Sequence, residues 1–211
     1  VELQADRALR HTLVAAQKPR MERVEMARRL ARWLMNATPT ASSLQTAVAW
    51  QSDQGAFVDW ARFRLLGGDE LPDLSQAYSA CREAVIARRN AFAKPFAQAL
   101  VQWNAQKPAP EGRIIPLESV LEHVLAPIAA AHPTLLLVMD GLSTSIFREL
   151  FARIASQGWA EMVPSSLGQP LAGVAALPTI TEVSRASLLC GRLTVGASAQ
   201  EKTGFATNAA L

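Results

Sequence analysis

A proline-rich segment divides the sequence into two parts with different hydrophobic patterns. The segment QKPAPEGRIIP, residues 106–116, places three prolines within eleven residues. Proline has no backbone N–H and a fixed φ, so clusters of it interrupt helices and sheets and are typical of linkers. We therefore expect a first region at residues 1–106, a linker at 107–116 and a second region at 117–211.

The first region has the spacing of helices almost throughout. Apolar residues recur every three or four positions within residues 21–34, and helical stretches also run from about 42 to 66 and from about 72 towards 103. Four tryptophans of this region are most simply packing residues between helices: Trp33, Trp50, Trp60 and Trp103. The sequence thus predicts an all-helical region before the linker.

Basic residues are concentrated near the start of the chain. Residues 1–35 contain eight Lys or Arg and four Asp or Glu, a balance of +4, whereas the whole chain carries +3. A basic helix of this kind can meet nucleic acid or an acidic partner. The same arginines also fit the solvated side of an amphipathic helix, and no aromatic interleaving or DNA-binding motif accompanies them. The solvated face is the simpler interpretation, which leaves contact with nucleic acid without support.

The second region alternates patterns of helix and strand. An apolar face recurs from residue 117 to 128, and the apolar run at 134–139 is typical of a strand buried on both faces of a parallel sheet. A helical pattern follows at 146–154, residues 159–163 predict a second strand, and the last helical stretch is 181–190. Strands alternating with helices indicate an α/β fold.

Asp140 directly follows the apolar run at 134–139. In open α/β sheets ligands gather at the carboxyl ends of strands, where a carboxylate is placed to bind a metal ion or to accept a hydrogen bond. The alternative is structural, because Asp140 and Gly141 are suited to form the turn that leaves the strand. Both interpretations stay open on the sequence alone.

Two threonines precede the last helical stretch in LPTITEVSRASLLCG, residues 177–191. Thr179 and Glu182 match the capping box, in which a hydroxyl caps the helix and a carboxylate follows three residues later. Thr181 would then lie at the second helical position, among amides that have no partner within the helix. It is either a spare polar residue of the first turn or a nucleophile, and a nucleophilic threonine needs a base or a metal to withdraw its proton.

The two motifs together resemble the start of a PglZ domain, a branch of the alkaline phosphatase superfamily. In that superfamily an apolar strand ends in an aspartate that binds metal, and a Thr or Ser nucleophile opens a later helix. In the related nucleotide pyrophosphatase/phosphodiesterases this helix opens with Pro-Thr-x-Thr and reaches a glycine ten residues beyond the nucleophile, which Pro178 to Thr181 and Gly191 match. Ser184 falls where those enzymes place an asparagine that contacts phosphate. The stretch TITEVSRASLLCGRL is especially similar to PglZ proteins of BREX-type phage defence systems, of the phage-growth-limitation branch.

This resemblance covers about residues 130–196 and implies a metal-dependent phosphatase or phosphodiesterase. It makes Asp140 a metal ligand and Thr181 both the nucleophile and a metal ligand, with zinc as the expected divalent ion. The expected fold is an incomplete alkaline-phosphatase-like α/β domain at 117–211, preceded by the all-helical region. Other proteins of the defence system are the expected partners.

One departure from the family pattern affects the metal site. The superfamily needs further aspartates and histidines after the nucleophile, but His11, His123 and His132 all precede Thr181, and residues 182–211 contain neither His nor Asp. Either the sequence is part of a longer protein or the protein is not catalytic, and we favour the first. We expect this chain alone to bind zinc weakly and to be inactive, because two divalent ions need several anionic or imidazole ligands each.

Two further residues of the last helical stretch are weaker candidates for a functional role. Cys190 has the spacing of a small core residue, and Arg185 is either a contact to phosphate or, more simply, a surface arginine. The main rival function is a non-catalytic scaffold whose helical half binds partners in the defence complex. A receiver-like module modified at Asp140 is disfavoured, because the usual acidic pair is missing.

The sequence predicts neither export nor membrane insertion. Its start is too charged for a signal peptide, and its most apolar stretch is broken by Pro127, His132 and Pro133. Two cysteines without a CxxC spacing are too few for a disulfide framework and fit a reducing compartment. We therefore expect a cytoplasmic protein that has no contact with a membrane.

Overall fold

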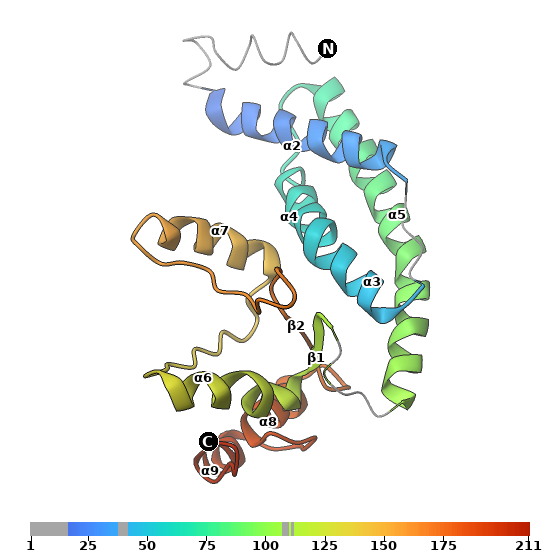
Figure 1. Cartoon of the computed structure of the whole chain (residues 1–211). Coiled ribbons are helices and arrows are strands. Elements are labelled where there is room, and N and C mark those ends of the chain that lie inside the picture. The colour runs from blue at the N-terminus through green and yellow to red at the C-terminus, as the bar shows by residue number, and fades with distance from the viewer. Residues whose placement is uncertain (1–16, 38–41, 107–109, 111) are drawn as a thin grey trace.

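The structure is a computed structural model, and it describes residues 17–37, 42–106, 110 and 112–211. Helices form most of the described part of the chain up to Ala105, and shorter elements around two strands follow (Figure 1). Among the described residues, no helix is both long enough and apolar enough to span a membrane.

Helices form the described part of the first region. They are α2 (Lys18–Met35), α3 (Leu44–Trp50), the π-helical turn η2 (Gln51–Gly55), α4 (Ala56–Arg64) and α5 (Pro72–Ala105). Helix α5 lies alongside α2, α4 and α3 and contacts all three (Figure 1). Helix α3 begins at a capping box in which the side chains of Ser43 and Thr46 each bond the other's backbone N–H. These helices agree with the apolar spacing of the sequence.

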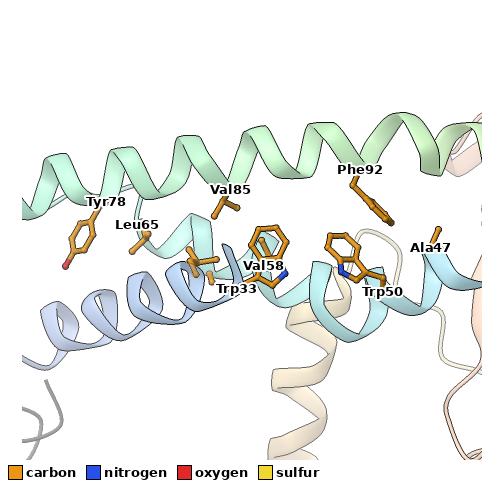
Figure 2. Close-up of a cluster of buried hydrophobic side chains, with 10 residues drawn as sticks. Trp33, Ala47, Trp50, Val58, Leu65, Tyr78, Val85 and Phe92 are labelled. Atoms are coloured by element: carbon orange, nitrogen blue, oxygen red, sulfur yellow. The ribbon is translucent and has the colours of Figure 1, made fainter. Parts of the chain in front are cut away.

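The core between these helices is rich in aromatic rings. Trp33, Trp50 and Phe92 are buried, and the centroid of the Trp50 ring lies 6.0 Å from that of Trp33 and 4.2 Å from that of Phe92. Figure 2 shows Phe92 pointing from α5 towards Trp50. Trp60 packs against this core and Trp103 against a smaller cluster beside it. The prediction that the four tryptophans are packing residues is confirmed.

A short parallel sheet forms at the boundary between the two regions. Strand β1 (Ile114–Pro116) pairs in parallel with β2 (Ala172–Val174). Ile114 is buried in a cluster with Leu44 and Ala99 of the first region. The end of the predicted linker is therefore a buried strand that packs on the helical region, and residues 107–109 and 111 of that linker lie outside the described residues.

Helices are the main regular elements of the second region. Its helical elements are η3 (Leu117–Ser119), the π-helical turn η4 (Leu121–Leu125), α6 (Ala126–Ala131), α7 (Thr144–Ala155), α8 (Thr181–Cys190) and α9 (Ser198–Ala206). Helix α7 contacts α4 of the first region, and α8 contacts both η3 and α9. The helices predicted at 117–128, 146–154 and 181–190 are present, whereas the sequence analysis did not predict α9.

The two predicted strands of the second region are wrong for this structure. Residues 134–139 and 159–163 carry no strand, and Leu135 is 86% exposed where burial on both faces was expected. A strand buried on both faces needs bonded neighbours at its edges and helices on its faces. The described residues pair only β1 with β2, so these apolar runs have no sheet to enter. The larger alkaline-phosphatase-like sheet stays a prediction.

Candidate functional site

Helix α8 begins one residue later than the capping-box prediction places it. Its N-cap is Ile180, whose extended backbone has φ −102° and ψ 158° and whose side chain offers no capping bond. The carbonyl of Ile180 accepts from the backbone N–H of Ser184 at 2.8 Å, which is the first bond of the helix. The prediction that Thr179 caps α8 is therefore wrong, and Thr181 is the first helical residue instead of the second.

The structure brings Thr181 and Asp140 together. The Thr181 hydroxyl Oγ1 donates a hydrogen bond to Asp140 Oδ2 at 3.1 Å, although the residues are 41 positions apart. Asp140 also precedes a turn, because Gly141 has a φ of +74° and the chain then enters α7 behind its N-cap Ser143. The turn and the bond to Thr181 coexist, so the two interpretations of Asp140 do not exclude each other.

Arg185 joins this pair from the next turn of α8. Its Nη1 donates to the same Asp140 Oδ2 at 3.3 Å, and its Nε donates to Glu201 Oε1 on α9 at 3.0 Å. The bond to Glu201 raises the pKa of the Arg185 guanidinium above its ordinary value; burial opposes this rise, and the charges of Glu201, Asp140 and Glu182 add to it. The interpretation of Arg185 as a plain surface residue is thus too simple, since two carboxylates fix its head group.

Glu201 is a member of the site that the sequence analysis missed. Its side chain is only 8% exposed, although it is charged and lies on a short helix. No apolar periodicity marks α9, so the sequence offers no signal that this glutamate faces inward. Charged side chains are rarely buried unless they are paired, and its partner here is Arg185.

The loop between α8 and α9 is tied back onto α8. The buried Ser187 Oγ donates to the carbonyl of Thr194 at 3.2 Å and accepts from its backbone N–H at 3.1 Å. A Cβ added at Gly204 would lie 3.1 Å from Cys190 Cα, so α9 packs closely on α8. These contacts fix α9, and with it Glu201, relative to the start of α8.

The other polar candidates of α8 have local roles. Ser184 Oγ donates to the carbonyl of Ala176 at 3.0 Å and so ties the helix to the preceding loop. Cys190 is half-buried, and its Sγ lies 3.6 Å from the carbonyl of Gln200 at the packing of α8 on α9. These contacts agree with a packing role for Cys190 and give Ser184 a structural bond.

A two-metal centre does not fit the described residues by themselves. Asp140 and Thr181 offer two oxygen ligands, but no group of three or more His, Cys, Asp or Glu able to hold a metal ion occurs within 17–37, 42–106, 110 and 112–211. Structural zinc takes four ligands and catalytic zinc at least three from the protein. The Arg185 guanidinium also shares Asp140 Oδ2 and would repel a second cation there.

A cavity of about 610 Å³ lies beside these residues. The neighbours of the site in the sequence, Met139, Leu142 and Thr179, line one part of it, and Phe96 of α5 lines another. Its size is in the range of pockets that hold small molecules. A ligand in this cavity would therefore lie next to the turn at Asp140 and the start of α8.

Comparison with known proteins found no matching family model, no similar curated protein and no similar solved structure.

Proposed function

We propose that this chain carries the nucleophile of a metal-dependent phosphatase or phosphodiesterase of the PglZ type, acting with other proteins of a BREX-type phage defence system. The observation that carries the proposal is the 3.1 Å hydrogen bond from Thr181 Oγ1 to Asp140 Oδ2. Both residues were singled out by separate sequence motifs, and they meet across 41 positions of chain. A threonine nucleophile needs a neighbouring group that can accept its proton, and the Asp140 carboxylate accepts the hydrogen bond of the Thr181 hydroxyl.

The position of these side chains supports a reaction in two steps. Oγ1 of Thr181 would attack phosphorus, the bond from phosphorus to the leaving oxygen would break, and the hydroxyl proton would pass to Asp140. Water would then release phosphate from the phospho-threonine and restore the hydroxyl. A carboxylate is a weak base for a free alcohol, so the proton transfer to Asp140 would complete only as the bond from Oγ1 to phosphorus forms, and Asp140 would then give up the proton to solvent. The divalent metal ions that the resemblance implies, zinc being expected, need ligands beyond the two present here.

The test is hydrolysis by the complete gene product, with nitrophenyl phosphate and bis(nitrophenyl) phosphate as the two substrates. Thr181→Ala should lower kcat by about a thousandfold or more, because the covalent route is lost. Thr181→Ser keeps a hydroxyl and should retain part of the activity. Thr179→Ala is the matched control and should retain most of it, since Thr179 has no capping bond. Full activity of Thr181→Ala, with Thr179→Ala inactive, would move the role to the other threonine.

A second candidate function is a non-catalytic scaffold of the same defence complex. Ile146, Phe147 and Leu150 on α7 are substantially exposed, as are Leu135 and Leu137 in the segment that precedes α7. Exposed apolar patches of this kind mark interaction surfaces. The metal content of the complete protein separates the candidates, because a scaffold has no need of a loaded site. Zinc that the complete wild-type protein binds stoichiometrically and that Asp140→Asn loses would contradict the scaffold function.

A further inference from the structure

Arg185 is held by two carboxylates with different surroundings. Its Nε lies 3.0 Å from Glu201 Oε1, and the Glu201 side chain is 8% exposed. Its Nη1 lies 3.3 Å from Asp140 Oδ2, and the Asp140 side chain is 47% exposed. Arg185 therefore has a buried, shorter contact on one side and an open, longer contact on the other.

The two contacts differ in how readily they can be exchanged. Exposed ion pairs contribute little because water competes for both charges. A buried carboxylate left without its partner is strongly unfavourable, so the contact with Glu201 is the one that is kept. An arriving anion can therefore replace Asp140 beside Nη1, while Glu201 keeps the guanidinium in the same place.

The orientation of the guanidinium also fits a kept contact with Glu201 and an exchangeable contact with Asp140. Glu201 binds Nε, which leaves the fork of Nη groups turned towards the side where Thr181 and Asp140 meet. Guanidinium groups bind phosphoryl oxygens well because their donors are planar and fixed in direction. Thr181 lies one helical turn before Arg185, so both side chains can reach one phosphoryl group.

We propose that Glu201 is a positioning residue, which holds Arg185 beside Thr181 so that Arg185 binds a non-bridging oxygen of the phosphoryl group. The proposal rests on the proposed function of Thr181 and assigns the recognition of its substrate. Arg185 supplies positive charge next to the nucleophile from the chain's own residues. Glu201 acts through Arg185 and does not touch the substrate.

The test is calorimetric titration of inorganic phosphate into the complete protein and its variants. Glu201→Gln keeps the shape of the side chain and removes its charge, and we expect the Kd for phosphate to rise roughly tenfold, as for a weakened charge-assisted bond. Glu182→Gln is the matched control, because Glu182 is an exposed carboxylate on α8, the helix of Arg185, and has no bond to Arg185 Nε. Glu182→Gln should leave the Kd unchanged or lower it slightly.

The sign of the effect separates positioning from simple electrostatics. Removing any nearby negative charge should strengthen the binding of an anion, so weaker binding in Glu201→Gln cannot come from charge alone. The Nε–H resonance of Arg185 in ¹H–¹⁵N spectra, assigned with Arg185→Lys, should shift in Glu201→Gln and stay in place in Glu182→Gln. If Glu201→Gln does not fold, Arg185→Lys is the second variant: it keeps the charge, loses the Nε donor and should also weaken phosphate binding about tenfold.

Phosphate binding by Glu201→Gln that equals or exceeds that of the wild type would overturn the proposal. A wild-type protein that forms phospho-threonine at Thr181 but whose phosphate affinity is unchanged in Arg185→Lys would also overturn it, and the proposed function would stand. Phosphate binding that is lost in both variants of a protein without turnover would support the anion site and count against the nucleophile.

Discussion

Replacement of Phe92 by alanine should remove a large part of the stability of the helical region. Phe92 is only 4% exposed and points towards Trp50 in the core (Figure 2). Its ring centroid lies 4.2 Å from that of Trp50 and 6.3 Å from that of Phe96. A buried Phe→Ala change costs about 3–5 kcal/mol, since apolar contact is lost and a cavity remains. Its two aromatic neighbours place Phe92 in the upper half of that range, at about 4–5 kcal/mol.

Urea denaturation followed by tryptophan fluorescence measures this loss. Trp33 and Trp50 lie in the same core, so their emission reports the unfolding of this region. Phe63→Ala is the matched control: Phe63 is 60% exposed and lies beside Arg62 on the surface of α4. It should cost less than about 1 kcal/mol. A Phe92→Ala protein as stable as Phe63→Ala would refute the packing of α5 on α3.

Three further predictions concern acid stability, helix packing and the helix start. A backbone hydrogen bond and Arg20 lower the pKa of the Asp69 carboxyl. The ionised carboxyl therefore stabilises the fold above the ordinary pKa of about 3.9, and this stabilisation is lost as the pH falls through the lowered pKa. Between pH 7 and pH 3, thermal melts should show a smaller drop in Tm for Asp69→Asn than for the wild type. Gly204→Ala places a Cβ directly against Cys190 Sγ and 3.0 Å from Cys190 Cβ. This change should lower the free energy of unfolding by about 1 kcal/mol, the cost of overpacking less the gain in helix propensity, as measured by urea titration. Thr179→Ala should change the free energy of unfolding by less than about 0.5 kcal/mol. A loss of about 1 kcal/mol would show that Thr179 caps α8 after all.

The helices of the first region could be predicted because their cause is local. Apolar side chains every three or four residues favour burial of one helix face, and the tryptophans of this region fill the space between helices. Pro95 inside α5 shows the limit of local rules, since the helix continues through it to Ala105. Packing of α5 against three other helices overrides the missing hydrogen bond.

The candidate site could be predicted in part. Thr181 and Asp140 carry recognisable motifs, and the structure brings them within hydrogen-bonding distance. Glu201 could not be found, because its burial depends on the close packing of α9 on α8 and not on any pattern in its own segment. The start of α8 was misplaced because an extended Ile180, and not a capping side chain, sets it.

The predicted strands failed for a reason that lies outside their own sequence. Residues 134–139 have the composition of a buried strand, but a strand exists only when another strand satisfies its backbone groups. In the described part of the chain those bonds form between β1 and β2. Composition therefore indicated that the segment tends to form a strand, but not whether another strand would pair with it.

Mass spectrometry of the acid-quenched complete protein, during turnover of a phosphoester, tests the central claim most directly. The account predicts a phosphoryl group on Thr181, whose Oγ1 lies 3.1 Å from Asp140 Oδ2. It predicts no phosphoryl group on Thr181 in Asp140→Asn, and none anywhere on the chain in Thr181→Ala. Turnover with no phosphoryl group on Thr181, or with the group on Thr179, would contradict it.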